Sequence, residues 1–176
     1  MSRKTRIVWL AVPLFLALLD LWTKAQAGPY PCGGEAPPPG KVVIQDWLEI
    51  RTAWNEGALF GFDWIPPWAL VLLTGLAVPL VAWWVFHPKT ADPKENFGKL
   101  LVLGGALGNL YDRLCFGKVR DFINFYYGSM EPGPGGQPAA HWPTFNIADS
   151  ALVAGVILLL LSSFLQRPVT AGGKAA

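Results

Sequence analysis

Two aspartates flank the loop that joins the last two apolar segments of the chain. Asp121 follows one segment, within Val119-Arg120-Asp121-Phe122, and Asp149 opens the next. Because a single loop joins them, both carboxylates must reach the same face of a membrane that the segments cross. An ionisable side chain at the bilayer centre costs roughly 2.5 to 3.5 kcal/mol, so such residues usually mark function. The pair predicts acid–base chemistry on a substrate held in the membrane.

Two carboxylates that share one water do not ionise together, so the pair titrates as a unit. The ionised member takes a proton from the water, and the protonated member polarises a scissile carbonyl. This is the arrangement of the aspartic proteases. The field at a helix start favours an ionised Asp149, and apolar neighbours favour a protonated Asp121.

Each aspartate also has a purely structural interpretation. With Asn146 as the N-cap, Asp149 is the third residue of a helix, where an acid satisfies free amide groups. Asp121 could instead form an ion pair with Arg120 or Lys118.

Further polar residues are expected at the same end of the apolar segments. Asp20 and Lys24 are four residues apart and can pair along one helix face. Asn109, Asp112 and Arg113 share one side of another helix and can bond each other or a neighbouring strand. We interpret that second cluster, taken alone, as structural.

Other chemistries fit the sequence less well. His87 and His141 fall on opposite sides of the membrane, so neither a two-histidine metal site nor a serine–histidine relay is expected. Cys32 and Cys115 lack the histidines of a zinc site. They are two unrelated thiols, or a disulfide if their compartment is oxidising. No basic run interleaved with aromatic residues points to nucleic acid.

The composition requires an apolar solvent. Hydrophobic residues make up 52% and charged residues 15% of the 176 residues, and the mean hydropathy is +0.34. Four stretches, at about 7–22, 68–86, 97–115 and 147–165, are long enough or nearly so to cross about 30 Å of hydrocarbon. Glycines and alanine within 104–108 suit close helix packing better than a phosphate-binding loop.

Basic residues set the orientation. Eight of the fourteen lie on one proposed side together with both termini, and ten of the twelve acids lie on the other. We therefore expect both termini in the cytoplasm and the aspartates outside. The first span has a rival interpretation as a cleaved secretory signal ending at Ala25-Gln26-Ala27, but Asp20 and Lys24 favour a retained anchor.

The outer region between the first two spans changes character along its length. Residues 28–40 are rich in glycine and proline and predict an irregular loop. Residues 41–62 alternate in polarity and predict one or two strands, with a turn at Asn55-Glu56-Gly57. Such strands belong at the membrane interface, where Trp47, Trp54 and Trp64 could anchor them. Residues 128–143 form a second glycine- and proline-rich loop, which could act as a lid.

Five blocks in order resemble the lipoprotein signal peptidases, the type II signal peptidase family of bacteria. They are Asp20 to Lys24, Asn55-Glu56-Gly57-Ala58-Leu59-Phe60-Gly61, Gly108-Asn109-Leu110-Tyr111-Asp112-Arg113, Val119-Arg120-Asp121-Phe122 and Phe145-Asn146-Ile147-Ala148-Asp149. Each block alone is a weak signal, but five in the family's order are specific. The proline-rich stretches 28–40 and 128–143 are longer than the family's usual pattern.

The resemblance implies a core of four transmembrane helices with a small extracytoplasmic β-cradle, in one integral-membrane peptidase domain of the bacterial inner membrane. It implies an aspartyl endopeptidase that cleaves prolipoproteins before a diacylglyceryl-modified cysteine, with Asp121 and Asp149 as the catalytic dyad. The residues implied to line, brace or support the site are Asn55, Gly57, Asn109, Asp112, Arg113, Asn146, Asp20 and Lys24. No metal or organic cofactor is implied. The implied partners are prolipoproteins, membrane lipids and inhibitors of the globomycin type.

Two non-enzymatic functions remain as alternatives. A small transporter or proton relay would also use intramembrane acids, but it would stagger them through the bilayer, whereas the second and third spans lack a charge at their middle. An assembly scaffold held by small-residue packing would leave Asp121 unexplained.

Overall fold

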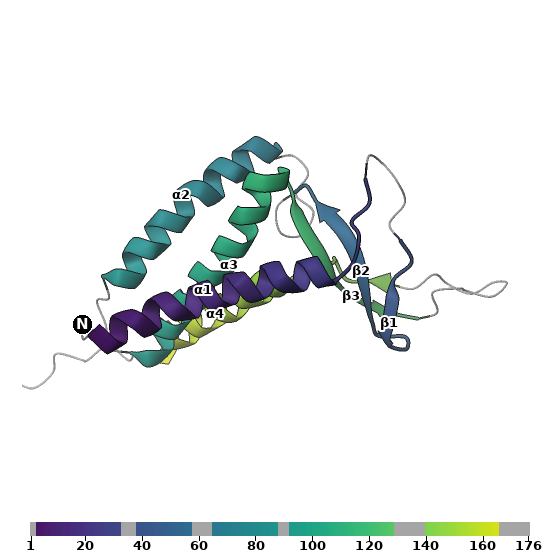
Figure 1. Cartoon of the computed structure of the whole chain (residues 1–176). Coiled ribbons are helices and arrows are strands. Elements are labelled where there is room, and N and C mark those ends of the chain that lie inside the picture. Colours follow the sequence, from purple (N-terminus) through teal and green to yellow (C-terminus); the bar gives the residue numbers. More distant parts are fainter. Residues whose placement is uncertain (1–2, 33–37, 58–64, 88–91, 129–139, 166–176) are drawn as a thin grey trace, which may run out of the picture.

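The computed structural model of the chain describes residues 3–32, 38–57, 65–87, 92–128 and 140–165. Within these residues, the structure has four helices, and an antiparallel sheet lies beyond one end of them (Figure 1). The helices are α1 (Arg3–Gln26), α2 (Pro67–Phe86), α3 (Pro93–Phe116) and α4 (Ile147–Leu165). The strands are β1 (Lys41–Ile44), β2 (Leu48–Asn55), β3 (Val119–Tyr127) and β4 (Ala140–His141).

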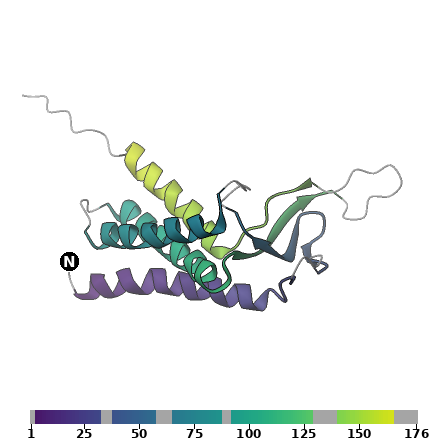
Figure 2. The same ribbon diagram turned by 90° about the horizontal axis from the view of Figure 1, so that it is seen from above.

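Helix α3 is central and packs against α1, α2 and α4. Its small residues permit this, as the sequence predicts. A methyl group on Gly104 would lie 2.8 Å from Leu16 of α1, and one on Gly105 would lie 2.8 Å from Leu152 of α4. Farther from the sheet, a methyl group on Gly155 of α4 would lie 2.7 Å from the Gly98 carbonyl oxygen of α3. Figure 2 shows the C-terminal end of α4 leaning away from α1. The small residues therefore hold α3 closely against both α1 and α4.

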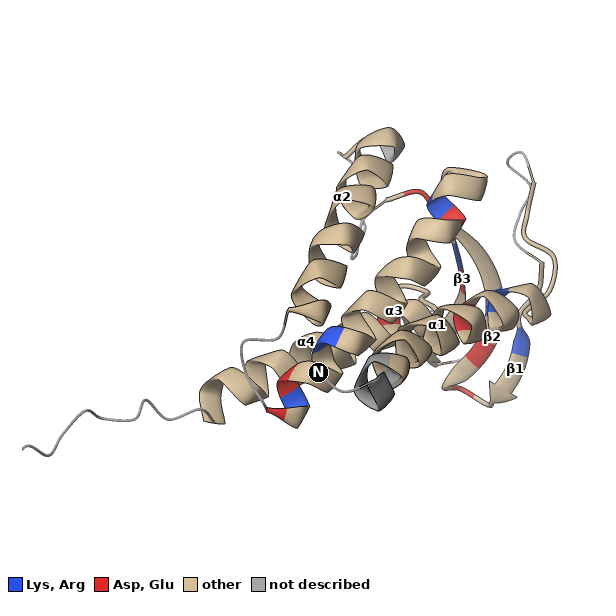
Figure 3. Ribbon diagram, turned by 60° about the vertical axis from the view of Figure 1, so that its left-hand side comes forward, with Lys and Arg blue, Asp and Glu red and all other residues tan. Residues whose placement is uncertain are grey.

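The outward faces of the helices are apolar. Leu14 and Leu18 on α1, Leu76 on α2, and Leu160 on α4 are each more than half exposed. Helix α2 carries no charged residue along its length (Figure 3). Among the described residues, two helices are long and apolar enough to cross a membrane, at Trp68–Phe86 and Ile147–Leu165. Such faces are stable in hydrocarbon and not in water.

The sheet is larger than the sequence analysis predicts. Strands β1 and β2 fall within the expected region 41–62, of which residues 58–62 lie outside the described residues. Two further strands were not expected, β3 directly after α3 and β4 within the stretch 128–143 that we interpreted as a loop. The order is β1-β2-β3-β4, with every pair antiparallel. The proposed lid cannot be followed, because residues 129–139 lie outside the described part.

Two local features place β3 beside the start of α4. Gly117, at a left-handed φ of 73°, ends α3 and turns the chain into β3, as glycine does at many helix ends. The Phe145 carbonyl then accepts hydrogen bonds from the backbone N–H groups of Phe122 and Ile123, at 3.1 and 2.9 Å. The residue after Phe145 is therefore held against the middle of β3.

Helix α4 has the bounds predicted for the last span and α2 is one residue longer than predicted, whereas α1 and α3 extend well beyond their predicted spans. Helix α1 runs from Arg3 to Gln26 instead of 7–22, and α3 from Pro93 to Phe116 instead of 97–115. In α3 the extra turn has a clear cause, since the Asp92 side chain accepts a hydrogen bond from the Lys94 backbone N–H at 3.0 Å and Pro93 suits the first helical position. Polar capping residues extend a helix beyond its apolar stretch.

Candidate active site

Asp121 lies on β3 with its carboxylate buried, 2% exposed. Two side-chain amides donate to it, Asn55 to Oδ2 at 3.0 Å and Asn146 to Oδ1 at 2.7 Å. Burial, together with the nearby Asp149 carboxylate, raises the pKa of Asp121 to about 7. A carboxyl group with such a pKa changes its protonation state near neutral pH, as acid–base catalysis requires.

Asn55 reaches Asp121 because of how β2 ends. A bulge between Ile50 and Ala53 shifts the register, so that Ala53 lies opposite Asp121 and Asn55 opposite Val119. The Gly57 backbone N–H then donates to Asn55 Oδ1 at 3.1 Å, which turns the amide nitrogen toward Asp121. Gly57 thus braces the site through Asn55.

Asp149 and Asn146 form a reciprocal cap at the start of α4. Asn146 Oδ1 accepts from the Asp149 backbone N–H at 2.8 Å, and Asp149 Oδ2 accepts from the Asn146 backbone N–H at 3.2 Å. The capping role predicted from the sequence is therefore confirmed. Asp149 Oδ1 has a separate partner, the Asn109 side-chain N–H, at 2.8 Å.

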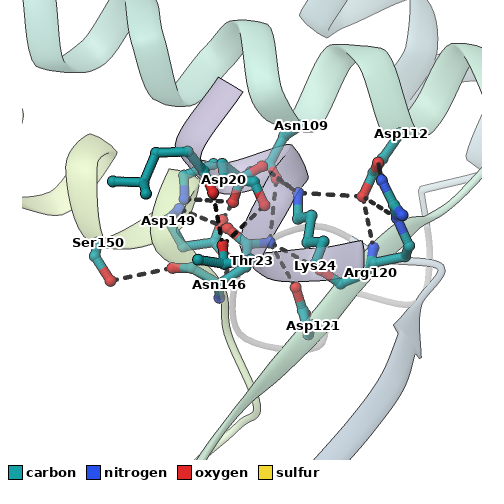
Figure 4. Close-up of polar contacts among 12 residues, drawn as sticks. Asp20, Thr23, Lys24, Asn109, Asp112, Arg120, Asp121, Asn146, Asp149 and Ser150 are labelled. Atoms are coloured by element: carbon teal, nitrogen blue, oxygen red, sulfur yellow. Dashed lines mark hydrogen bonds and ion pairs between the residues drawn. The ribbon is translucent and has the colours of Figure 1, made fainter. Parts of the chain in front are cut away.

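Asn146 links the two carboxylates. Its side-chain N–H donates to the Asp121 carboxylate, and its backbone N–H donates to the Asp149 carboxylate (Figure 4). Its side-chain oxygen accepts from the Asp149 backbone N–H. The structure thus brings together two acids that are twenty-eight positions apart in the chain. The suggested ion pairs of Asp121 are not formed, because Arg120 binds Asp112 and Lys118 binds Glu56.

A buried ionic network supports this pair from the side of α1. Lys24 Nζ lies 2.6 Å from Asp20 and 3.1 Å from Asp112, and all three side chains are fully buried. Asp20 also accepts from the Ala148 backbone N–H at 2.9 Å, and Asp112 binds the Arg120 guanidinium at 2.7 Å. The predicted pairing of Asp20 with Lys24 is confirmed, as is the bonding of Asp112 to a neighbouring strand.

An apolar groove of about 340 Å³ reaches the Asp149 carboxylate. Its walls are formed by α2, α3 and α4, with Leu73, Val81 and Leu152 among the apolar residues that line it. Its polar end holds the side chains of Asn55, Asn109, Arg113 and Asp149. Arg113 therefore lines the groove and is drawn toward Asp149 by charge. The helices that form its walls have apolar outer faces, and its polar end includes one of the two acids.

The predicted site residues gather at one place, but the sequence analysis missed two participants. Arg120 was considered only as a partner of Asp121, whereas it holds Asp112 through its side chain and its backbone N–H. The wall that α2 gives to the groove was also missed, because that uncharged helix offers no reactive side chain to single out. The β-branched and aromatic run in 119–127 was the available signal for β3.

The remaining reactive groups lie apart from this network. Cys32 and Cys115 are both exposed and are not joined in a disulfide. Within the described part of the chain, no three His, Cys, Asp or Glu side chains are arranged to hold a metal ion.

Comparison with known proteins places the chain in a family. The profile of a family described as "Signal peptidase (SPase) II" matches residues 12–165. A lipoprotein signal peptidase of Chlorobaculum tepidum is 37% identical over 82% of the chain and 86% of its own length. One of Acinetobacter baylyi is 36% identical over 90% of the chain and 82% of its own length.

Solved structures show the same fold. A bacterial membrane enzyme determined by the in meso method at 2.3 Å resolution has a TM-score of 0.72 and 23% sequence identity, over 96% of this chain and 94% of that one. A second such structure, at 1.9 Å resolution, has a TM-score of 0.68 and 24% identity, over 91% and 94%. With the matched profile running from within α1 to the end of α4, the chain belongs to the signal peptidase II family.

Proposed function

We propose that this protein is an aspartyl endopeptidase of the bacterial inner membrane. It removes signal peptides from prolipoproteins by cleaving before the diacylglyceryl-modified cysteine, with Asp121 and Asp149 as its catalytic dyad. The observation that carries this proposal is the role of Asn146, which bonds one carboxylate through its side chain and the other through its backbone. The membership of the signal peptidase II family supports it.

The mechanism follows from the environments of the two acids. Asp149 is the ionised member, because the start of α4 and the Asn109 amide favour its negative charge. Asp121 is the protonated member, because its pKa is raised to about 7. Asp149 takes a proton from a shared water, whose oxygen attacks the scissile carbonyl while Asp121 protonates the carbonyl oxygen. The carboxyls then exchange roles as the leaving amine receives a proton.

The substrate approaches through the groove between α2, α3 and α4. Its apolar walls suit the hydrophobic segment of a signal peptide and the lipid on its cysteine, and its polar end delivers the peptide bond to the acids. Asn55, Asn109 and Arg113 bind the peptide there, while Asp20, Lys24 and Asp112 support the site. Cyclic peptide inhibitors of the globomycin type would occupy the same groove.

The proposed topology has four membrane spans with both termini in the cytoplasm. Helices α1 and α3 cross the bilayer together with the two more apolar helices, and their ionic groups Asp20, Lys24 and Asp112 are buried against one another rather than against lipid. The sheet then lies at the extracytoplasmic interface. The acids gather at one end of the helices and are not staggered through the bilayer, so we favour a peptidase over a proton relay.

The test is to replace Asp121 and Asp149 singly with asparagine and to follow a lipid-modified precursor on a gel. Asparagine keeps the size of the side chain but cannot exchange a proton, so neither variant should cleave the precursor. Glu56→Gln is a matched control, because Glu56 is an exposed acid that pairs with Lys118. Full processing by either aspartate variant, expressed and folded like the control, would exclude the proposed dyad.

A further inference from the structure

The amide of Asn109 lies between a buried lysine and one of the two acids. Its Oδ1 accepts from Lys24 Nζ at 3.1 Å, and its Nδ2 donates to Asp149 Oδ1 at 2.8 Å. All three groups are buried, with Lys24 at 0%, Asn109 at 4% and Asp149 at 8% exposure. A hydrogen-bonded path therefore runs from a cation on α1 through an amide on α3 to a carboxylate on α4.

Lys24 determines which way this amide points. An ammonium group has three donors and no acceptor. Its three acceptors here are Asp20, Asp112 and the Asn109 side-chain oxygen. A reversed Asn109 amide would set its NH₂ against the ammonium group and its oxygen against the Asp149 carboxylate. With Lys24 in place, Asn109 must direct an N–H toward Asp149.

Asn146 reinforces the same orientation. Its side-chain N–H donates to Asn109 Oδ1 at 3.2 Å as well as to Asp121 at 2.7 Å. A reversed Asn109 would therefore also meet a donor from Asn146. The Asn109 oxygen is thus held by two donors, Lys24 and Asn146, and the Asn146 amide is itself oriented by the Asp149 backbone N–H that its Oδ1 accepts.

We propose that Lys24 is a positioning residue for the dyad, which acts through Asn109 to keep Asp149 as the ionised member. The inference rests on the proposed function. Lys24 contacts neither Asp121 nor the substrate groove; it fixes and polarises the amide that does contact Asp149. A fixed donor stabilises a carboxylate relative to its protonated form, so loss of Lys24 makes Asp149 hold its proton to a higher pH.

The charged groups around this path are known. They are Asp20 and Lys24 on α1, Asp112 and Arg113 on α3, Arg120 and Asp121 on β3, and Asp149 on α4. Removing Lys24 alone would leave Asp20 without its cation, whereas Asp112 keeps Arg120. The informative variant is therefore Lys24→Met combined with Asp20→Asn, which removes one charge of each sign and keeps an acceptor for the Ala148 N–H.

The experiment measures kcat and KM for a lipid-modified precursor between pH 4 and 9. In the charge-balanced double variant, the acid limb of the kcat profile should move up by about one pH unit, so that kcat falls about tenfold below the limb. The plateau and KM should stay unchanged, because the groove is intact. A role in folding alone would lower activity at every pH and leave the limb in place. Lys24→Arg keeps a donor-only cation and should retain the limb.

Two controls separate the path from other effects. Lys99→Met with Glu95→Gln removes another fully buried lysine and its partner on α3, about 15 Å along the helix from Asn109, and should leave the limb unmoved. Asn109→Ala removes the amide and should move the limb by itself. Adding the Lys24 and Asp20 changes to it should then produce no further shift.

The outcomes distinguish this inference from the function on which it rests. If the acid limb does not move in the folded double variant, the role of Lys24 is overturned. The role is also overturned if the Lys24 and Asp20 changes shift the limb as much in the Asn109→Ala protein as in the wild type. If the double variant does not fold, Asn109→Ala decides alone, and an unmoved limb there overturns the path. Cleavage by Asp121→Asn or Asp149→Asn would remove the proposed function itself, whatever the Lys24 variants show.

Discussion

The contact between Gly105 on α3 and the start of α4 should control activity through a single methyl group. A Cβ atom on Gly105 would lie 2.8 Å from Leu152 Cγ and closer still to the Ala148 carbonyl oxygen, whereas ordinary contact begins near 3.4 Å. Gly105→Ala therefore forces α4 back by roughly 1 Å. That displacement would carry the 2.8 Å bond between Asn109 and Asp149 past the ~3.5 Å limit of a hydrogen bond.

The magnitudes follow from overpacking and misplacement. Inserting a methyl group into a packed contact costs about 1–3 kcal/mol, and the better helix propensity of alanine returns up to ~1 kcal/mol. A net loss of up to about 2 kcal/mol lowers the Tm of a chain of this size by up to roughly 8 °C. A misplacement of about 1 Å at a catalytic group lowers kcat by on the order of 100-fold. Thermal unfolding in detergent and precursor cleavage measure the two effects.

Gly75 on α2 supplies the matched control. A Cβ atom there would meet nothing within 4 Å. Gly75→Ala should therefore raise the Tm by about 2–4 °C through helix propensity and leave cleavage at the wild-type rate. If Gly105→Ala behaves like Gly75→Ala in both assays, the close approach of α3 and α4 does not position Asp149 and the reasoning is refuted.

Two further predictions concern the groups around the acids. The pKa of Asp121 rises from 3.8 to about 7 on folding, so the folded protein loses stability as the pH rises from about 4 to 7. The Asp121→Asn variant lacks this loss. Its unfolding free energy, relative to that of the wild type, should therefore increase by about 4 kcal/mol between pH 4 and pH 8. Denaturant titrations at the two pH values test this, and an equal difference at both would contradict the assigned pKa. Asn146→Ser keeps a helix cap but cannot reach Asp121, so it should cleave as poorly as Asn146→Ala while being about 1 kcal/mol more stable. Equal stability of the two variants would contradict the capping role of Asn146, and cleavage preserved by serine would contradict its role at Asp121.

Local patterns allowed much of the site to be predicted. The spacing of Asp20 and Lys24 predicts their ion pair, and Asn146 three residues before Asp149 predicts the cap. The small residues of 104–108 predict close helix packing. In each case the interaction is set by residues one helical turn apart or by the absence of a side chain. Both features can be read from the sequence alone.

The long-range pairings could not be predicted in the same way. Nothing in the sequence places the Asn55 side chain within hydrogen-bonding reach of Asp121, because that contact depends on a bulge in β2 and on pairing across 66 residues. Arg120 has two acids within reach along the chain, and only the turn at Gly117 directs it to Asp112. The contact of Lys24 with Asn109 likewise depends on the packing of α1 against α3.

The central claim is that Asp121 and Asp149 share one proton during catalysis, and the dependence of kcat on pH tests it most directly. The wild-type protein should give a bell-shaped profile on a lipid-modified precursor, with an alkaline limb near pH 7 where Asp121 loses its proton. A profile that stays flat or keeps rising from pH 5 to pH 9, in protein that remains folded throughout, would contradict the account.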